Sequence, residues 1–409
     1  MDLVVTSEHR FVRTPDGAVW TDGVHSYEIS SRYLPAFDNV KVVARVREEP
    51  SVNPAWRRAS GPGVNFIRVP YYVGPRQYLA QRAEVRRVIA DAAGPGDAVI
   101  LRVSSQIAGC LESALSRSGQ PYGLEVVNDP WDVYAPSAVR HPARPLFRRW
   151  FTRQLRRQCR RAAAVSYVTE TILQKRYPCP SYCVGISDVE LPREALVAKA
   201  PKPPNQGSPY RLVTVGSLEQ MYKATDVLIR ALAGVREAGV NLVLDVVGDG
   251  RLRPAFELLA ADIGVASRVT FHGQVPGGAA VRRYLDGADL FVLPSRTEGL
   301  PRAMVEAMAR ALPCIGSEAG GIPELLSPED LVPVNDVQAL ARKIQEVLSS
   351  PARMAEMSAR NLARAHDFAD DKLASRRREF LDCVRHATSA WLIRPRRAAE
   401  WSKGEAPIW

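Results

Sequence analysis

Short apolar runs rich in β-branched residues alternate with helical patterns in both halves of the chain. In the first half these runs are Leu3–Thr6, Val40–Val46, Val64–Val69, Ala98–Val103, Leu124–Val127 and Ala164–Val168. In the second half they are Arg211–Gly216, Leu242–Val247, Val269–Gly273, Leu290–Pro294 and Cys314–Ser317. After about Asp336 the pattern is helical, over Val337–Leu348, Ala352–Ala365 and Lys372–Val384. This alternation is typical of parallel sheets built from βαβ units, so we expect an α/β protein.

A proline-rich segment, AKAPKPPNQGSP at residues 198–209, separates the two halves. Proline fixes φ and removes a backbone donor, so this segment is predicted to be a linker outside either sheet. The length of 409 residues also favours more than one domain. We expect two Rossmann-like, doubly wound domains, residues 1–197 and 210–365, facing a central cleft. Ligands are expected at the carboxyl ends of their strands.

Composition and targeting signals narrow the class of protein. Hydrophobic residues make up 46% and charged residues 24%, as in folded globular proteins. No apolar run approaches the roughly 20 residues that span a bilayer, and the N-terminus lacks the features of a secretory signal. We therefore expect a cytoplasmic protein. The six cysteines are scattered, and Cys179 and Cys183 lack the partners of a zinc site, so neither a metal nor a cofactor is expected.

The net charge of +11 favours anionic partners. Nucleotide phosphates and lipid headgroups both fit, and so does a solvated arginine-rich surface without any such partner. No nucleic acid is expected, because the chain has no helix-turn-helix pattern or aromatic-rich sheet.

The segment Leu290–Leu326 carries the most specific pattern, LFVLPSRTEGLPRAMVEAMARALPCIGSEAGGIPELL. A buried strand is followed by a polar turn and by a helix that begins near Pro301, where proline is well tolerated. The amides of Gly299 and Leu300 precede this helix, and a helix N-terminus favours phosphate. Glu298 lies in the turn and Glu306 lies in the helix, about 10 Å further along. The two carboxylates are thus placed to reach opposite ends of an extended nucleotide sugar.

A second strand, loop and helix pattern covers Arg211–Leu232, RLVTVGSLEQMYKATDVLIRAL. Lys223 stands where the loop meets the helix, and its compact charge suits a diphosphate leaving group. The stretches Leu242–Phe256 and Arg268–Val275 add a Gly-Asp-Gly turn and a strand that ends at Gly273. His272, a single histidine on that strand, is interpreted as a packed residue.

Together these stretches resemble the retaining GT-B enzymes called family-4 glycosyltransferases, with their E-x7-E motif. The resemblance implies that Glu298 contacts the donor sugar and that Glu306 holds the ribose hydroxyls. It also implies a diphosphate grip by the loop of Gly216 and Lys223. Where the family has arginine and a second glycine in this loop, the chain has Ser217 and Ala224, so Arg296, Arg302 or backbone amides would have to assist Lys223. The catalytic residues expected are Glu298 and Lys223, and the donor-binding residues are Gly216, Ser217, Gly248, Gly273, Gln274, Val275, Gly299, Leu300, Pro301 and Glu306.

The resemblance is weaker in the first half of the chain. A polar loop in Ala18–Leu34 leads into a helix near His25, at the position of the family's first loop between donor and acceptor. Asn128 and Asp129 follow a strand where many relatives carry a histidine, and we interpret them as a plain turn. By the same resemblance, residues 1–197 would bind the acceptor and residues 210–365 the donor. The helices of 366–409 would cross back to the first domain.

A basic segment, 143–161, has Phe147, Trp150, Phe151 and Leu155 at helical spacing among many arginines. Such a helix can lie on an anionic membrane, which would place the protein at the inner face of the membrane. The interpretation we favour instead buries the aromatic side chains in the domain and leaves the arginines in water.

The resemblance implies transfer of a sugar from a UDP-, GDP- or dTDP-linked donor to an acceptor hydroxyl with retention and without a metal. The acceptor is not indicated, and cell-surface polysaccharide and natural-product pathways both stay open. Two alternatives also stay open, an epimerase acting on a sugar nucleotide and a donor-binding subunit without turnover.

Overall fold

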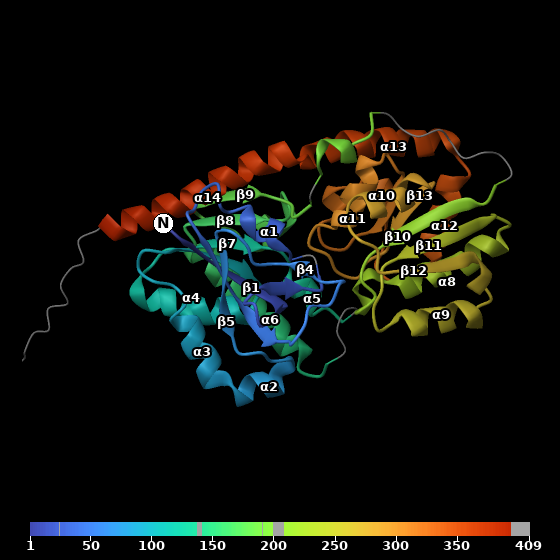
Figure 1. The fold of residues 1–409 in the computed structure, drawn as a ribbon. Helices are drawn as coiled ribbons and strands as arrows, with labels where there is room; N and C mark the ends of the chain where they lie inside the picture. Colours follow the sequence, from blue (N-terminus) through green and yellow to red (C-terminus); the bar gives the residue numbers. More distant parts are fainter. Residues whose placement is uncertain (24, 137–140, 190, 199–207, 394–409) are drawn as a thin grey trace, which may run out of the picture. The chain divides into compact units, whose positions relative to one another are not determined.

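The computed structural model describes residues 1–23, 25–136, 141–189, 191–198 and 208–393. Figure 1 shows their helices and strands, coloured along the chain. These residues form two compact units that do not follow the order of the chain. Unit 1 contains residues 1–100, 109–122 and the end of the chain from Asp382, and unit 2 contains residues 101–108 and 123–381. The predicted linker lies almost wholly outside the described residues, as does the end of the predicted 366–409 segment. The predicted domain boundaries therefore stay a prediction.

Unit 1 is built on a largely parallel sheet. Strand β1 (Leu3–Arg13) pairs in parallel with β3 (Val40–Glu48) and with the start of β6 (Ala98–Val103), and β3 pairs with β5 (Val64–Val69). The short strands β2 (Val19–Thr21) and β4 (Arg57–Arg58) add an antiparallel extension. The helices α1 (Tyr27–Ser31), α2 (Gly74–Ala80) and α3 (Arg82–Ala90) follow these strands, and most of α4 (Gln106–Ser118) is in this unit.

Unit 2 contains three parallel strands from the first half of the chain, β7 (Gly123–Val126), β8 (Ala164–Tyr167) and β9 (Tyr182–Gly185). Between β7 and β8 lie the short helix α5 (Pro130–Val133) and the longer α6 (Arg144–Arg161), and α7 (Ile172–Arg176) follows β8.

The same unit holds a second, fully parallel sheet. Its strands are β10 (Tyr210–Val215), β11 (Leu242–Val247), β12 (Val269–Gly273), β13 (Leu290–Leu293), β14 (Cys314–Ser317) and β15 (Leu331–Val332). Their order, β12-β11-β10-β13-β14-β15, is the doubly wound order 3-2-1-4-5-6. The order reverses between β10 and β13, so the carboxyl ends of these two strands are where a ligand is expected. The predicted α/β class is confirmed.

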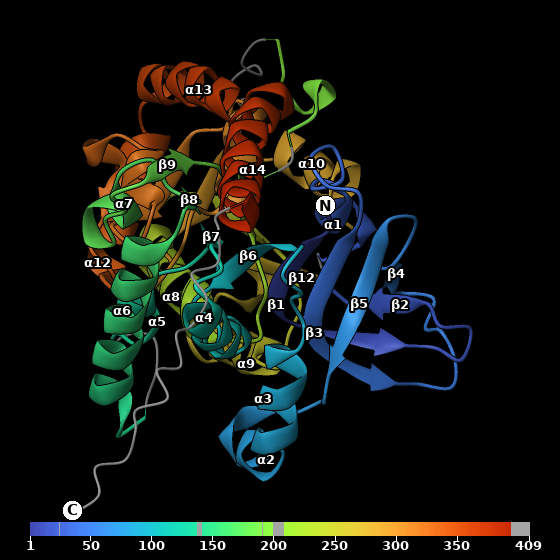
Figure 2. The ribbon, with the colours of Figure 1, turned by 90° about the vertical axis from the view of Figure 1, so that its left-hand side faces the viewer.

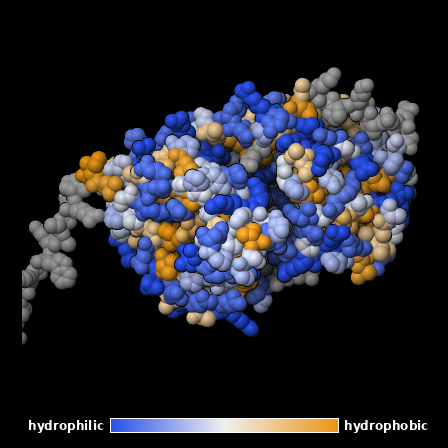
Figure 3. Space-filling view, viewed as in Figure 1, coloured by the Kyte–Doolittle hydropathy of each residue, from blue (hydrophilic) through white to orange (hydrophobic). Residues whose placement is uncertain are grey.

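Helices cover this second sheet. They are α8 (Thr225–Glu237), α9 (Arg253–Asp262), α10 (Ala279–Asp286), α11 (Arg302–Ala309), α12 (Val337–Leu348) and α13 (Pro351–Ala365). Leu228 and Leu232 of α8 and Ile344 of α12 pack with Leu244 and Val292 of the sheet, and all five are fully buried. Burying such side chains is the main source of stability of a sheet covered by helices. On the surface seen in Figure 3, apolar residues form only small separate patches among hydrophilic ones.

The last helix, α14 (Asp370–Ile393), contacts residues from the first half of the chain within unit 2. Arg376 forms an ion pair with Glu170 at 3.1 Å, and the Tyr182 hydroxyl donates to Glu379 at 3.0 Å. Its residues from Asp382 onward are grouped with unit 1. Among the described residues, no helix has both the length and the apolar character required to cross a membrane.

Candidate active site

Lys223 follows the strand β10 at the point where the second sheet changes direction. After Gly216 the chain forms a loop and a short 3-10 turn, Met221–Lys223, and then α8 begins at Thr225. Ala224 between them has a left-handed backbone with φ of 52°, a conformation that glycine adopts most easily. This position is the one where the family resemblance predicts glycine. The Lys223 ammonium group donates to Glu298 Oε1 at 2.7 Å.

Glu298 lies in the loop between β13 and α11, the other side of the same switch point. Its Oε1 also accepts from the Ser295 hydroxyl at 2.6 Å. Its Oε2 has no hydrogen-bonding partner among the described residues. The side chain of Glu298 is 9% exposed and that of Lys223 is 26% exposed. The structure thus brings together the two predicted catalytic residues and leaves one carboxylate oxygen available.

Arg296 fixes the two loops to one another. Its guanidinium group forms two hydrogen bonds to the Asp226 carboxylate, each of 2.8 Å, and donates to Met221 O at 2.8 Å. Its backbone N–H donates to Tyr222 O at 2.7 Å. Arg296 is therefore engaged by protein groups and positions the Lys223 loop, whereas the sequence left open whether it assists Lys223 at the diphosphate. No local sequence pattern identifies Asp226 as its partner.

The turn after β11 closes against the loop after β10. Leu218 N donates to Asp249 O, and Leu252 N donates to Leu218 O. A Cβ atom on Gly248, whose φ is 139°, would lie 1.9 Å from Gly216 O, so no other residue fits without moving the loop. Arg251, the residue after this turn, donates to Glu219 O at 2.9 Å, which places an arginine against the loop of Ser217.

The strand β12 ends beside this turn, where Gly248 N donates to Gly273 O at 2.9 Å. Gln274 is exposed and Val275 is half-buried, so the edge predicted for the nucleotide base is accessible. His272 Nε2 lies 2.6 Å from Asp245 Oδ1, and its ring lies 4.5 Å from that of Tyr284. These contacts agree with a packed histidine.

The helix α11 begins at Arg302, with the buried Pro301 at its N-cap position. The backbone N–H groups of Gly299 and Leu300 donate to no acceptor in the described part of the chain, so both remain available to an anion. Glu306 lies half-buried on the first turns of the helix, as predicted. Arg302 forms no ion pair with a described residue.

A second loop, 319–324, holds the Glu298 loop from the other side. Gly321 N donates to Gly299 O at 2.7 Å. A Cβ atom on Gly320 would lie 2.0 Å from Glu298 O, so glycine is required for this approach. Glu324 accepts from the backbone N–H groups of Glu170 at 2.6 Å and Thr171 at 2.9 Å, and so caps the start of α7.

Asn128 and Asp129, at the end of β7, have structural partners. Asn128 Oδ1 accepts from Ser104 N at 3.1 Å. Asp129 is 1% exposed; its Oδ1 accepts from Trp131 N at 2.8 Å and from the Tyr177 hydroxyl, and its Oδ2 accepts from Arg176. Burial raises the pKa of Tyr177, which keeps this hydroxyl a donor. These contacts support the interpretation of a turn.

Unit 1 contains the predicted first loop and a separate hollow. His9 Nε2 lies 2.6 Å from the Thr21 hydroxyl, and its ring lies 4.8 Å from that of His25. Val24 lies outside the described residues.

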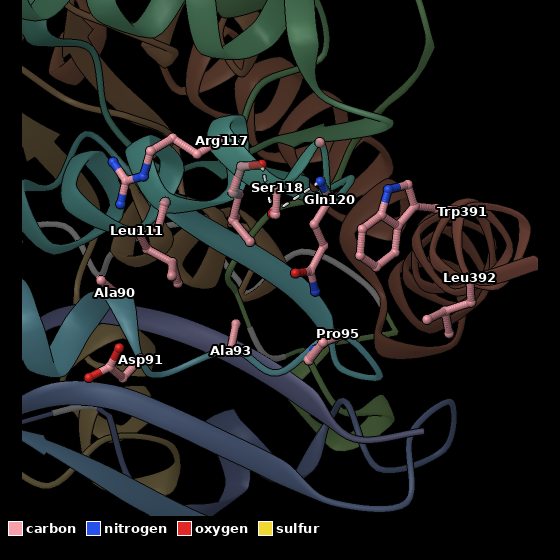
Figure 4. A pocket seen from close by; sticks show the side chains of 13 residues that line it. Ala90, Asp91, Ala93, Pro95, Leu111, Arg117, Ser118, Gln120, Trp391 and Leu392 are labelled. Carbon is pink, nitrogen blue, oxygen red and sulfur yellow. Dashed lines mark hydrogen bonds between the residues drawn. The ribbon is translucent and has the colours of Figure 1, made fainter. Parts of the chain in front are cut away.

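The hollow, of about 970 Å³, lies beside α3, α4 and the end of α14 (Figure 4). Asp91 and Arg117 are its charged lining residues, and none of the predicted site residues lines it.

Comparison with known proteins shows which proteins the segment around the site is similar to. Residues 209–350 match the model of the family described as "Glycosyl transferases group 1". This segment is therefore similar to the group 1 glycosyltransferases. It contains both glutamates of the E-x7-E pattern, Lys223 and the loops that surround them.

The chain is 26% identical to Protein CapJ of Staphylococcus aureus over 339 residues, which are 80% of this chain and 81% of CapJ. It is 33% identical to the amylovoran biosynthesis glycosyltransferase AmsK of Erwinia amylovora over 172 residues, 40% of this chain and 41% of AmsK. The chain thus spans less than half of AmsK.

The fold is similar to that of HepE from Anabaena, solved in complex with UDP and glucose. The TM-score is 0.64 at 15% sequence identity, over 93% of this chain and 99% of HepE. At this identity the similarity shows the fold alone, which is GT-B, as predicted.

Proposed function

We propose that the protein transfers a sugar from a nucleotide-sugar donor to an acceptor hydroxyl, with retention of configuration and without a metal, in the assembly of a polysaccharide. The observation that carries the proposal is the Lys223–Glu298 pair at the switch point of the second sheet. The similarity to the group 1 glycosyltransferases and the similarity to AmsK, which is named for amylovoran biosynthesis, support the reaction class and the pathway.

In this proposal the donor lies across the carboxyl ends of β10 and β13. Lys223 and the free amides of Gly299 and Leu300 oppose the negative charge of the diphosphate. Glu298 uses its free Oε2 to accept from a sugar hydroxyl, and Glu306 holds the ribose at the other end. With Ser217 in place of arginine and Arg296 bound to Asp226, Lys223 is the principal side-chain cation, and Arg251 is placed beside the loop to assist.

The chemical step needs positioning and electrostatic stabilisation more than it needs a nucleophile. The bond between the anomeric carbon and the diphosphate oxygen breaks, and its electron pair goes to the diphosphate. The acceptor oxygen bonds to the anomeric carbon on the face that the diphosphate leaves. The acceptor proton passes to the departing diphosphate oxygen, so no general base is required. Glu298 keeps the sugar in register during this step.

The donor can be identified first by a thermal shift panel of UDP-, GDP- and dTDP-sugars. A ligand at 100 times its dissociation constant stabilises the folded state by about 2.7 kcal/mol, which such a scan detects. Release of nucleoside diphosphate is then measured with and without candidate acceptor glycosides. Release that requires an acceptor supports transfer. Conversion of the sugar without release would support an epimerase, and binding without either reaction would support a donor-binding subunit.

A further inference from the structure

Helix α6 runs beside α5 (Figure 2). Its exposed side has apolar side chains near the start of the helix and arginines along the rest. Leu146 and Trp150 are each 65% exposed, and Phe147 is 38% exposed. We name these three residues, together with the exposed arginines of the helix, the α6 face. Those arginines are Arg149, Arg153, Arg156, Arg157, Arg160 and Arg161. The sequence-based interpretation that the aromatic side chains are buried is therefore wrong for Phe147 and Trp150.

The buried side of the helix explains this orientation. Thr152, Leu155, Gln158 and Cys159 are buried in unit 2 and recur at helical spacing, so the rotation of the helix about its axis is fixed. The opposite side therefore points away from the rest of the unit. Its central row is Leu146, Trp150, Arg153, Arg157 and Arg160, with successive members three or four residues apart.

The charges of the α6 face are not balanced locally. The helix contains no aspartate or glutamate. Arg149, Arg153, Arg160 and Arg161 form no ion pair with any residue that the structure describes. Five arginines, at 153, 156, 157, 160 and 161, line a single hollow of about 440 Å³. Like charges at this spacing repel one another, and an anionic partner would relieve that repulsion.

We propose that the α6 face binds the surface of an anionic lipid bilayer. The arginines would contact lipid phosphates, and Leu146, Phe147 and Trp150 would enter the headgroup region, where tryptophan is enriched. The apolar residues favour a bilayer over a nucleic acid, because a phosphodiester backbone would leave Leu146 and Trp150 in water. This surface involves neither Lys223 nor Glu298, so the inference stands apart from the proposed glycosyl transfer.

The test is co-sedimentation of the full chain with vesicles of phosphatidylcholine, alone or mixed with phosphatidylglycerol. We expect binding to the mixed vesicles only. A polybasic residue near an anionic surface contributes roughly 1 kcal/mol, so removing three arginine charges should weaken binding about 100-fold. The variant for this arm is R153Q/R157Q/R160Q.

A matched control removes the same charge from exposed arginines on α8, α10 and α12, in the variant R230Q/R283Q/R342Q. We expect it to bind like the unchanged protein. A second variant, L146S/W150S, keeps every charge but removes the apolar contact, and it should bind at least about 10-fold more weakly. Circular dichroism melting shows whether each variant is folded, and only folded variants are compared.

Three results would overturn the proposal. Equal binding to pure phosphatidylcholine would show that the lipid charge is irrelevant. An equal loss in the control variant would show that net charge acts without the α6 face. Full binding of L146S/W150S to the mixed vesicles would show that Leu146 and Trp150 do not enter the headgroup region, which contradicts the proposed mode of binding.

Discussion

Two regions of unit 2 pair a carboxylate with a cation directly after a parallel strand, and they use the pair differently. After β7, Asp129 is 1% exposed and both its oxygens are occupied, by Trp131 N, the Tyr177 hydroxyl and Arg176. After β13, Glu298 is 9% exposed and only its Oε1 is occupied, by Lys223 and Ser295. The two pairs have the same elementary chemistry and nearly the same place on a strand.

The two pairs differ in whether the carboxylate keeps a free hydrogen-bond acceptor for a ligand. A saturated carboxylate that caps a helix and holds a buried tyrosine has no acceptor left, so its role is to stabilise the fold. A carboxylate with a free oxygen, beside a partly exposed lysine and two amides without acceptors, can still bind. We therefore expect substitutions in the first region to affect stability and substitutions in the second to affect activity.

The largest expected effect is on the free energy of unfolding, and it should differ between the two regions. Asp129→Ala would leave the buried Tyr177 hydroxyl and the partly buried Arg176 without their acceptor. We expect the free energy of unfolding to fall by about 3 kcal/mol. Glu298→Gln should lower it by less than about 1 kcal/mol, because the amide keeps one acceptor for Lys223 and Ser295. Urea unfolding of both variants at neutral pH measures the difference, and equal losses would contradict the comparison.

Substitution of Lys223 is expected to affect activity much more than stability. Lys223→Ala should reduce kcat/KM by on the order of 100-fold, about 3 kcal/mol, since its charge opposes the diphosphate mainly in the transition state. The unfolding free energy should fall by about 1 kcal/mol or less, because Glu298 loses its cation but keeps the hydrogen bond from Ser295. Lys343→Ala on α12, which removes another lysine from a carboxylate partner, is the control. Unchanged turnover in Lys223→Ala would remove this residue from the site.

The sequence predicts the local features of the fold and of the site, such as strands and turns. Strands β5, β6, β11, β12 and β14 begin and end at the residues that the apolar runs indicated, because a buried parallel strand is a continuous apolar run. The turn of Glu298 and the helix after it were also predicted, since proline and glycine mark such a boundary locally. The residues that the motif places on each side of the switch point do meet there.

Contacts between distant segments could not be predicted. Arg296 and Asp226 are 70 positions apart, and Glu324 is 153 positions from Thr171. Any arginine or glutamate on the surface has the same local sequence signal as these, so only the folded structure identifies the partners. The short strands β2 and β4 were missed as well, because two or three residues are too few to show a period. The exposure of Trp150 depends on which side of α6 packs on the unit, and this too is a tertiary property.

A smaller effect, on ligand binding, is expected from Glu306 and Glu298, which we assign to opposite ends of the donor. Glu306→Gln should weaken binding of free nucleoside diphosphate and of sugar nucleotide alike by about 1.5 to 3 kcal/mol, the usual contribution of a hydrogen bond to a charged group. Glu298→Gln should leave binding of free nucleoside diphosphate almost unchanged while it lowers the transfer rate. Calorimetry with both ligands and both variants distinguishes the roles. Equal loss of free nucleotide binding in both variants would refute this assignment.

The smallest expected effect concerns Glu170, a third carboxylate, which is saturated like Asp129 but less buried. Its side chain is 32% exposed, and its two oxygens accept from Arg364 at 2.8 Å and Arg376 at 3.1 Å. Burial alone would raise the pKa of Glu170, but the hydrogen bonds and charges of the two arginines outweigh it and lower the pKa below 4.5.

A carboxylate whose pKa is lower in the folded state than in the unfolded state adds stability above the unfolded value, and this stability is lost as the pH falls through the folded value. The contribution of Glu170 should therefore be complete above the unfolded value near 4.5 and should be lost as the pH falls through the lower folded value. We expect Glu170→Gln to lose about 1 kcal/mol of unfolding free energy at pH 7, in keeping with a partly exposed ion pair. The difference between the two proteins should shrink toward zero at low pH. A difference that stays constant from pH 7 to acid would mean that Glu170 stabilises the fold through its shape and not through its charge, and saturation by arginines would then not explain its role.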